Sequence, residues 1–281
     1  MDKESLPKLY GVLGYPVKHS FSPLMQNKAF QALKINAKYL LFEKRPEEID
    51  GFLHSLRKEN IYGLNITIPY KEKILDFVRL NKESSYLGEI KAVNTIALEN
   101  GIWNGFNTDI PGFSKALREH IDPKNKRAAI LGAGGAGRAV AYALALSGVS
   151  EISIFDIDEF KSRNVTDTIK KLFPNFAISP VYNIEKLDIK NKDLLINATP
   201  VGLKKTDPCL VREEMLDKNL FVYDLIYNPP ETELLAIAKK AGAKVANGLG
   251  MLLYQGMLSF QIWTGQKAPK EIMRKALLGG L

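Results

Sequence analysis

The sequence has one cysteine, three histidines and no long uninterrupted apolar run, and each shortage excludes a class of protein. The single cysteine, Cys209, cannot form a disulfide within the chain, which favours a reducing compartment, so we expect a cytoplasmic protein. His19, His54 and His120 do not have the spacing of metal ligands, so we predict that the chain binds no metal.

Segments for export or membrane anchoring are also missing from the sequence. Met1–Ser5 lacks the apolar core of a signal peptide. Residues 128–149 are apolar enough to be confused with a membrane span, but their glycines and the central Arg138 argue against one. We therefore expect no membrane partner.

What the sequence does contain is an ordinary apolar content and an excess of basic residues. Hydrophobic residues make up 46% of the 281, as in a globular chain of one large or two ordinary domains. The formal net charge is +8, from 39 Lys and Arg against 31 Asp and Glu. The lysines are dispersed and accompany no nucleic-acid motif, so we predict a solvated surface that attracts small anionic substrates and binds no nucleic acid. The oligomeric state stays open.

A glycine-rich segment is the most informative motif. The apolar run Ala128–Leu131 predicts a buried strand, which ends at Gly132-x-Gly134-x-x-Gly137, and residues 139–146 predict a helix. In a dinucleotide site the first glycine makes a tight turn, the second admits a pyrophosphate and the third lets helix and strand pack closely. The pyrophosphate then meets free N–H groups at a helix N-terminus. The alternative is a plain glycine-rich turn.

The rest of the chain alternates strand and helix patterns, which predicts an α/β fold with parallel strands. We expect a hairpin around Glu99-Asn100, a helix from Pro46 to Arg57, a helix capped by Asp109 that runs to about His120, and a polar linker over 122–126. Further strands are predicted over residues 9–13, 39–42, 63–68, 151–155, 194–198 and 220–224, and further helices over 23–32 and 250–263.

Seven short motifs follow one another along the chain. They are Gly14–Pro23 (GYPVKHSFSP), Gly63–Lys71 (GLNITIPYK), Ala92–Thr95 (AVNT) with Gly105–Asp109 (GFNTD), the glycine-rich turn, Asn197–Thr199 (NAT), Asp224–Pro229 (DLIYNP) and Gly248–Gln255 (GLGMLLYQ). Together they resemble the shikimate dehydrogenase family, which includes quinate/shikimate dehydrogenases. The resemblance implies an N-terminal α/β catalytic domain, completed by the C-terminal helices, and a Rossmann-like doubly wound nucleotide domain. The implied bounds are 1–108 with 249–281 for the substrate domain and 109–248 for the dinucleotide domain.

The resemblance also implies roles for residues of a substrate site. Ser20, Ser22 and Tyr227 would bind a carboxylate, and Asn65, Thr67, Asn94 and Gln255 would bind ring hydroxyls. Lys71 and Asp109 would be the catalytic pair, with either group able to move the proton. Each residue has an ordinary alternative. The two serines can cap a helix, the asparagines and Gln255 can bond to backbone, Lys71 can be an exposed charge and Asp109 an N-cap.

For the cofactor, the resemblance implies binding by Gly132, Ala133, Gly134, Gly135, Ala136, Gly137, Asp156, Asp158, Lys161, Asn197, Thr199, Leu225, Gly248 and Met251. Many NADP-using members carry Asn-Arg-Thr where this chain has Asp156-Ile157-Asp158. Asp156 is placed to accept ribose hydroxyls and would repel a 2′-phosphate, so we predict NAD as the preferred cofactor and keep NADP as the alternative, because Lys161 matches a second basic position. Otherwise, Asp156 and Asp158 form a solvated turn in which Asp158 caps a helix.

The predicted function is therefore oxidation and reduction between shikimate and 3-dehydroshikimate with NAD, and quinate as a further substrate. The nearest alternative is NADP-linked biosynthetic reduction, and a non-catalytic nucleotide-sensing module is a more distant one. The chain departs from the family pattern at Gln26, usually His, at Lys91, usually Gly, and at Pro200, often Ser.

Overall fold

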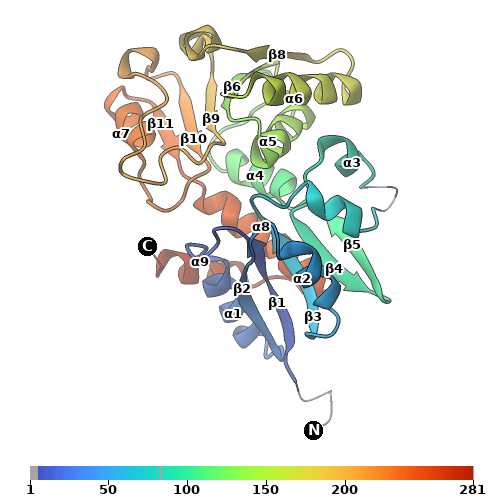
Figure 1. Ribbon diagram of the computed structural model, residues 1–281. Coiled ribbons are helices and arrows are strands. Elements are labelled where there is room, and N and C mark those ends of the chain that lie inside the picture. The colour runs from blue at the N-terminus through green and yellow to red at the C-terminus, as the bar shows by residue number, and fades with distance from the viewer. Residues whose placement is uncertain (1–5, 81, 83, 281) are drawn as a thin grey trace. The chain divides into compact units, whose positions relative to one another are not determined.

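The computed structural model describes residues 6–80, 82 and 84–280. Met1–Ser5, which lack a signal-peptide pattern, lie outside the described residues, as does position 281. The chain divides into two compact units, one made of the residues up to Thr108 together with Leu252–Gly280, the other of Asp109–Met251. Each unit has its own sheet (Figure 1).

The first unit is built on a five-stranded mixed sheet of order β2-β1-β3-β4-β5. Strand β1 pairs in parallel with β2 and with β3, whereas β3–β4 and β4–β5 pair antiparallel. The predicted hairpin is present, and its turn residues Asn100 and Gly101 both have positive φ. The strands are β1 Lys8–Gly14, β2 Ala37–Glu43, β3 Ile61–Ile66, β4 Thr95–Glu99 and β5 Ile102–Phe106.

Helices cover this sheet through an aromatic core. Trp263 stacks on Tyr10 with ring centroids 5.1 Å apart, and its indole N–H donates to the carbonyl of Ile96 at 3.0 Å. Gly63 makes this possible, because a Cβ there would lie 2.3 Å from the indole nitrogen. The helical segments are α1 Ser22–Ala32, α2 Ile49–Ser55, η2 Lys73–Phe77, α3 Tyr86–Ile90, α8 Leu249–Thr264, which begins within the bounds of the second unit, and α9 Lys270–Leu278.

In the first unit one helix is shorter than predicted, and one departure from the family pattern has a structural explanation. The helix predicted from Pro46 to Arg57 is wrong at both ends, since α2 covers only Ile49–Ser55. Before it, the Glu48 N–H donates to the Arg45 carbonyl at 3.0 Å and the Arg45 N–H donates to the Glu48 carboxylate, so residues 45–48 form a turn that leads into the helix. Lys91, where the family has glycine, has φ of 48°, a left-handed conformation that glycine adopts at lower cost.

The second unit is a fully parallel six-stranded sheet of order β11-β10-β9-β6-β7-β8. The chain order reverses between β6 and β9, which is the arrangement of a doubly wound fold and confirms the predicted fold class. The strands are β6 Arg127–Leu131, β7 Glu151–Phe155, β8 Ala177–Val181, β9 Leu194–Asn197, β10 Phe221–Asp224 and β11 Lys244–Ala246.

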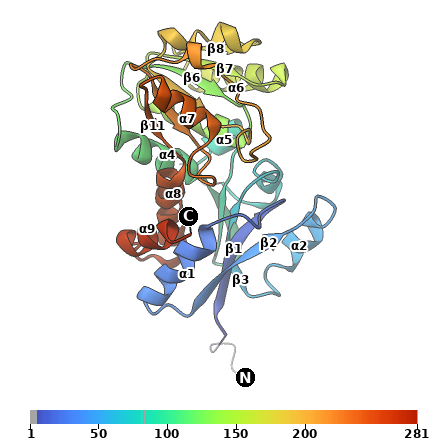
Figure 2. The same ribbon diagram turned by 90° about the vertical axis from the view of Figure 1, so that its left-hand side faces the viewer.

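Right-handed crossovers place helices on both faces of this sheet. Helices α5 and α6 follow β6 and β7 on one face, and α7 follows β10 on the other (Figures 1 and 2). On the α7 face, Leu234, Leu235 and Ala238 pack in one buried cluster with Leu131 and Val222 of the strands. The helical segments are α4 Asp109–Arg118, α5 Gly135–Leu146, α6 Glu159–Leu172, η3 Ile184–Leu187, η4 Ile189–Asn191, η5 Glu213–Met215 and α7 Glu233–Lys240.

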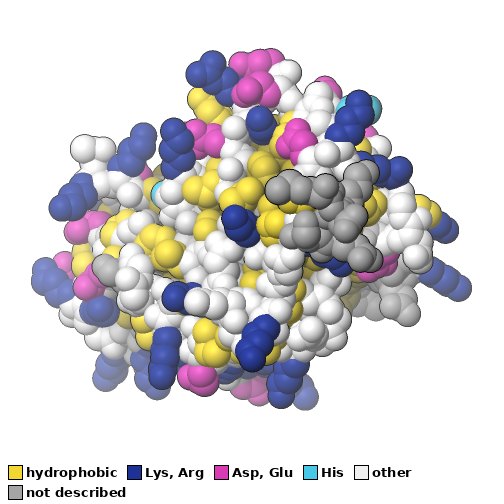
Figure 3. All heavy atoms as spheres, turned by 90° about the horizontal axis from the view of Figure 1, so that it is seen from below, with side chains coloured by type: hydrophobic (Ala, Val, Ile, Leu, Met, Phe, Trp, Pro, Cys, Tyr) yellow, Lys and Arg dark blue, Asp and Glu magenta, His cyan; other side chains and the backbone are white. Residues whose placement is uncertain are grey.

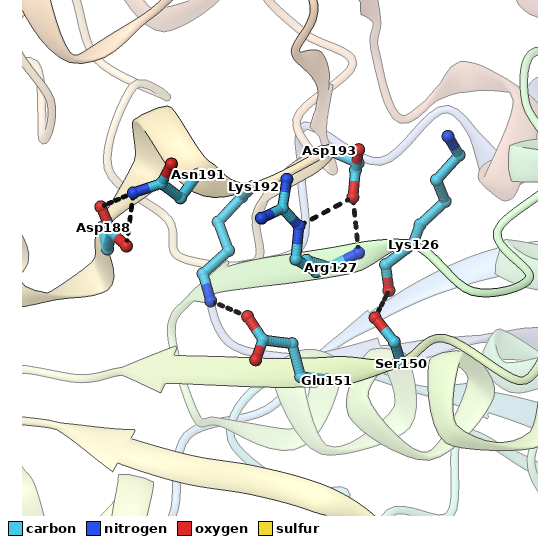
Figure 4. Close-up of polar contacts among 8 residues, drawn as sticks. All are labelled: Lys126, Arg127, Ser150, Glu151, Asp188, Asn191, Lys192 and Asp193. Carbon is cyan, nitrogen blue, oxygen red and sulfur yellow. Dashed lines mark hydrogen bonds and ion pairs between the residues drawn. The ribbon is translucent and has the colours of Figure 1, made fainter.

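Polar side chains tie together the amino ends of these strands (Figure 4). The Asp193 carboxylate accepts from the Arg127 backbone N–H at 2.8 Å and from its guanidinium at 3.4 Å, which joins the starts of β9 and β6. Beside it, the buried ammonium of Lys192 pairs with Glu151 of β7. Burial opposes ionisation of Asp193, but the hydrogen bonds from Arg127 outweigh it and lower the pKa of the carboxyl. This edge therefore carries structural contacts.

The basic residues counted in the sequence form no continuous band on the face drawn in Figure 3, where Lys and Arg side chains stand apart from one another. No helix within the described part of the chain is long and apolar enough to span a bilayer. The excess of positive charge thus lies, on that face, on separate solvated side chains.

Replacing Asp193 by Asn should reduce the free energy of unfolding by about 1 kcal/mol at pH 7, since a charged hydrogen-bond acceptor is lost. A lowered pKa in the folded state stabilises above the ordinary value of 3.8 and loses that contribution as pH falls below it. The difference between the parent and Asp193→Asn should therefore shrink toward pH 3 in urea titrations. Asp167→Asn, on the exposed side of α6, is the control. A difference that is unchanged by pH would contradict this account.

Candidate active site

The first unit buries a cluster of neutral polar side chains where β3, β4 and α8 meet. Asn65, the second-last residue of β3, pairs with Thr95, the first residue of β4, and Gln255 and Ser259 lie one turn apart on α8. All members of the cluster are less than 9% exposed: Asn65, Asn94, Thr95, Thr108, Gln255 and Ser259. Because buried amides and hydroxyls are costly without partners, their hydrogen bonds define the site.

Asn65 is held by side chains from three other elements. Its amide nitrogen donates to the hydroxyls of Ser259 at 2.8 Å and Thr95 at 3.0 Å, and its oxygen accepts from the Tyr39 hydroxyl at 2.7 Å. The alternative that Asn65 bonds to its own backbone is wrong. Its side chain is fixed in place by residues from β2, β4 and α8.

Asn94 and Gln255 join the same cluster through Thr108. The Asn94 oxygen accepts from the Thr108 backbone N–H at 2.7 Å, and its nitrogen donates to the Thr108 hydroxyl at 3.0 Å. Gln255 donates to the carbonyl of Leu252 at 2.9 Å, as its alternative expected, and its oxygen lies 3.5 Å from the Thr108 hydroxyl. The structure thus joins Asn65, Asn94 and Gln255 into one network. The linking Thr95, Thr108 and Ser259 were not predicted.

Ser20 lies in the loop before α1, and Ser22 is the first residue of that helix. The Ser20 hydroxyl accepts from the Ser22 backbone N–H at 3.3 Å, so part of the capping alternative holds, although the N-cap position itself is Phe21. Glu43 fixes this loop, since its carboxylate accepts from the Val17 N–H at 3.0 Å. That hydrogen bond lowers the pKa of Glu43. No sequence pattern marked Glu43, because the contact joins residues 26 apart.

Thr67 and Lys71 follow β3 in a half-buried loop. The Thr67 N–H donates to the carbonyl of Leu13 at 2.9 Å, and the Lys71 carbonyl accepts from Val93 at 3.2 Å. Glycine at position 14 is required here, since a Cβ would lie 2.3 Å from the Thr67 methyl. The other proposed catalytic residue, Asp109, belongs to the second unit and is 7% exposed. It is the first residue of α4 rather than an N-cap before it, and α4 ends at Arg118, short of His120.

In the second unit the glycine-rich turn has the geometry expected of a dinucleotide site. Gly132 has φ of 97°, and a Cβ on Gly137 would lie 2.0 Å from the Gly132 carbonyl oxygen, so helix and strand pack at backbone distance. A Cβ on Gly134 would meet no atom within 4 Å. Open space above Gly134, at the N-terminus of α5, leaves room for an anion to approach the backbone.

Asp156, at the end of β7, holds two backbone segments together. One carboxylate oxygen accepts from the Ala133 N–H at 2.7 Å and the other from the Asp158 N–H at 2.9 Å. Asp158 is the N-cap of α6, as its alternative expected, and it pairs with Lys161 at 3.7 Å. Ile157, between the two aspartates, is 94% exposed. Lys161, the basic side chain proposed to bind the cofactor here, thus already has the Asp158 carboxylate beside it.

The ends of β9 and β10 form a second hydrogen-bonded group in this unit. The oxygen of Asn197 accepts from the Thr199 N–H at 3.0 Å and hydroxyl at 2.7 Å, and its nitrogen donates to Asp224 at 3.0 Å. Asp224 also accepts from Thr232, the N-cap of α7, at 2.7 Å. Burial raises the pKa of Asp224, despite its hydrogen bonds. The sequence motif included Asp224 but gave it no role.

The remaining predicted site residues of this unit are Leu225, Gly248, Met251 and Tyr227. The Leu225 N–H donates to the Asn197 carbonyl at 2.9 Å. A Cβ on Gly248 would lie 1.9 Å from the Leu225 carbonyl oxygen, so only glycine fits there. Met251 is buried and Tyr227 half-buried. In this unit the structure gathers Asn197, Thr199 and Leu225 at the carboxyl edge, where doubly wound sheets bind ligands.

Family models match both ends and the middle of the chain. A model described as the shikimate dehydrogenase substrate binding domain matches residues 12–96, and one described as the shikimate 5'-dehydrogenase C-terminal domain matches residues 248–278. A model of the ThiF family matches residues 107–169, which include the glycine-rich turn.

Individual proteins are similar over nearly the whole chain. A shikimate dehydrogenase (NADP(+)) of Methanopyrus kandleri is 41% identical, over 95% of this chain and 94% of its own. A shikimate dehydrogenase crystallised with NADP+ is 38% identical with a TM-score of 0.88, over 97% of this chain and 95% of that one. A shikimate 5-dehydrogenase from Listeria monocytogenes, crystallised with shikimate and NAD, is 33% identical with a TM-score of 0.85, over 98% and 99%. These comparisons confirm the resemblance inferred from the motifs.

The two glycines allow a paired test of the turn. Gly137→Ala should lower the free energy of unfolding by several kcal/mol or prevent folding, because the new methyl group overlaps the Gly132 carbonyl. Gly134→Ala should change it by less than about 1 kcal/mol, since the methyl group enters open space. Thermal unfolding of both variants measures this. Equal losses of stability would contradict the geometry described for the turn.

Proposed function

The chain belongs to the shikimate dehydrogenase family, and we therefore propose that it is an enzyme that interconverts shikimate and 3-dehydroshikimate with a nicotinamide dinucleotide. The observation that carries the proposal is the buried network of Asn65, Asn94 and Gln255. Such a network suits a substrate with several hydroxyls. Each amide is already oriented by protein partners, so an analogue that lacks a hydroxyl leaves a buried group unpaired.

We assign the substrate contacts in two groups. Asn65, Thr67, Asn94 and Gln255 would bind ring hydroxyls, through amides and a hydroxyl that both donate and accept. Ser20, Ser22 and Tyr227 would bind the carboxylate as hydroxyl donors. This assignment is supported by the loop in which Ser20 and Ser22 share a hydrogen bond.

Lys71 and Asp109 would carry the proton chemistry. In the oxidative direction the substrate hydroxyl loses its proton while the carbon that bears it loses a hydride, and a carbonyl forms. A bound nicotinamide would supply the acceptor for that hydride. Either a cationic Lys71 would stabilise the developing alkoxide while the Asp109 carboxylate takes the proton, or a neutral Lys71, oriented by Asp109, would take the proton itself. In the reductive direction the same pair returns the proton to the carbonyl oxygen.

The second unit would hold the dinucleotide. The open space at Gly134 and the N-terminus of α5 fit a pyrophosphate, which the turn from Gly132 to Gly137 would bind through its backbone N–H groups. Asn197, Thr199, Leu225, Gly248 and Met251 are the residues proposed to line the nicotinamide end. The residues present therefore fit the cofactor.

We further propose that NAD is preferred over NADP. A 2′-phosphate within about 4 Å of the Asp156 carboxylate would be repelled by on the order of a few kcal/mol. Lys161, which could offset that repulsion, lies beside Asp158 at 3.7 Å, and the position of a phosphate-binding arginine is Ile157. The second candidate is NADP, which is named as the cofactor of the Methanopyrus kandleri enzyme and is bound in one of the crystal structures above.

Quinate is a further substrate to consider. Quinate carries one more hydroxyl than shikimate, at the carbon that bears the carboxylate, so the space around Ser20 and Ser22 decides whether it is a further substrate. We also propose a cytoplasmic location, because the single cysteine has no partner for a disulfide within the chain. Initial rates with shikimate and quinate, each with NAD and NADP, test the proposal. Four inactive combinations with a protein that still binds dinucleotide would favour the nucleotide-sensing alternative.

Replacing Lys71 by Met or Asp109 by Asn should lower kcat for shikimate oxidation by about 10²- to 10⁴-fold, because each removes one half of the proposed acid–base pair. Dinucleotide affinity, followed by fluorescence, should stay within about threefold of the parent. Lys73→Ala is the matched control, since Lys73 is an exposed neighbour paired with Asp50. A Lys71→Met variant that keeps more than about a tenth of kcat would contradict the assignment.

Replacing Ile157 by Arg should raise kcat/KM with NADP by at least about tenfold, because a cation would then stand where a 2′-phosphate arrives. Ile157 is 94% exposed, so the change should not affect folding. Ile157→Gln, of similar reach but neutral, should leave the ratio of NAD to NADP unchanged. A parent protein that already prefers NADP would contradict the role given to Asp156.

A further inference from the structure

We propose that Tyr39 and Ser259 are positioning residues that set the polarity of the substrate site: they orient the Asn65 amide so that it offers the substrate only an oxygen acceptor. This inference rests on the proposed function and concerns the hydroxyl-binding half of that site. Neither residue belongs to the predicted site. Both are buried, Tyr39 at 1% and Ser259 at 0% exposure.

The orientation of Asn65 follows from groups that can only donate or only accept. The Ser259 hydroxyl has a single hydrogen, which it donates to the backbone carbonyl of Gln255 at 3.1 Å. A carbonyl cannot donate in return, so toward Asn65 the Ser259 oxygen can only accept. The group that faces Ser259 at 2.8 Å is then the amide nitrogen of Asn65, which also lies 3.5 Å from the backbone carbonyl of Asn94, a group that can only accept. The amide oxygen then faces the other way, toward Tyr39.

Tyr39 completes the arrangement on the oxygen side. Its hydroxyl donates to the Asn65 oxygen at 2.7 Å, while the second N–H of the amide is taken by Thr95 at 3.0 Å. An amide has two N–H donors and two lone pairs. Both donors and one lone pair are now used within the protein. One lone pair remains, and it can accept a hydrogen bond only from a donor such as a hydroxyl.

The Asn94 amide is also held in one orientation, but the group that it offers to a ligand is a donor. A backbone N–H can only donate, and the Thr108 N–H points at the Asn94 oxygen at 2.7 Å, so that side of the amide is the oxygen. The oxygen also receives the Thr95 hydroxyl at 3.1 Å. The nitrogen donates one hydrogen to Thr108 at 3.0 Å and keeps one N–H. The pair thus presents an acceptor from Asn65 and a donor from Asn94, a pattern that matches neighbouring hydroxyls of one ligand.

The backbone of Tyr39 is held as firmly as its side chain. Asn27 of α1 accepts from the Tyr39 N–H at 2.8 Å and donates to its carbonyl at 2.9 Å. The Tyr39 ring also packs against Trp263, with centroids 5.9 Å apart. Asn27 was assigned no role from the sequence. It anchors the strand that carries Tyr39.

The test compares shikimate with its two analogues that lack one of the non-reacting ring hydroxyls. A site built to bind a hydroxyl rejects the analogue without it, by up to about 10⁴-fold in kcat/KM. Tyr39→Phe and Ser259→Ala should each lower the selectivity against one analogue by at least about tenfold, because each removes one of the hydrogen bonds that hold the Asn65 amide in this orientation. In Tyr39→Phe the amide keeps its bonds to Ser259 and Thr95 but loses the one on its oxygen, so it is held less firmly rather than reversed. KM for shikimate should rise more than kcat falls, and dinucleotide affinity should not change.

Tyr10→Phe is the matched control. Tyr10 belongs to the same aromatic cluster, is 3% exposed and stacks on Trp263, but the hydrogen bonds of Asn65 do not include it. Its removal should leave the selectivity unchanged. An active parent whose Tyr39→Phe and Ser259→Ala variants keep full selectivity would overturn this inference alone. A parent that does not oxidise shikimate would overturn the proposed function and this inference with it.

Discussion

The arrangement of the site depends on one constraint, that polar groups removed from water must find hydrogen-bond partners. In the first unit the constraint falls on three amides and three hydroxyls buried between β3, β4 and α8. Their mutual hydrogen bonds occupy most of their donors and acceptors and leave a few at defined positions. A ligand meets those few donors and acceptors, so the chemistry of recognition follows from how the buried groups bond to one another. A substrate rich in hydroxyls is the kind of molecule that completes such a set.

The same constraint shapes the second unit, where the buried groups include carboxylates. Asp224 is fully buried and is held by Asn197, Thr232 and the Ile226 N–H, which together fix the loops after β9 and β10. Asp156 plays the corresponding part after β7 by accepting from the glycine-rich turn. Both lie at the carboxyl edge of the parallel sheet, where the chain order reverses nearby and where this fold places its ligands. Scaffold and site are therefore made of the same contacts.

Features set by short stretches of chain could be predicted, whereas those set by register and distant contacts could not. The roles of Gly132 and Gly137 were predictable, because a turn and a close helix–strand contact leave a fixed glycine spacing. Tyr39 and Ser259 were not, because their partner Asn65 lies 26 and 194 residues away. The start of α2 was misplaced because residues 45–48 close a separate turn, in which the Glu48 N–H donates to the Arg45 carbonyl, before the helix begins at Ile49. The position of Lys91 shows the converse, a departure from the family pattern that the backbone conformation explains.

The central claim, that this chain moves a hydride from shikimate to a bound dinucleotide, is tested most directly by isotopic labelling. Shikimate deuterated at the carbon whose hydroxyl is oxidised would be turned over, and the reduced nicotinamide analysed by mass spectrometry. The account predicts that each reduced nicotinamide carries one deuterium and that the label does not reach water. Reduced nicotinamide without deuterium, or no reduction at all by a protein that binds both ligands, would contradict it.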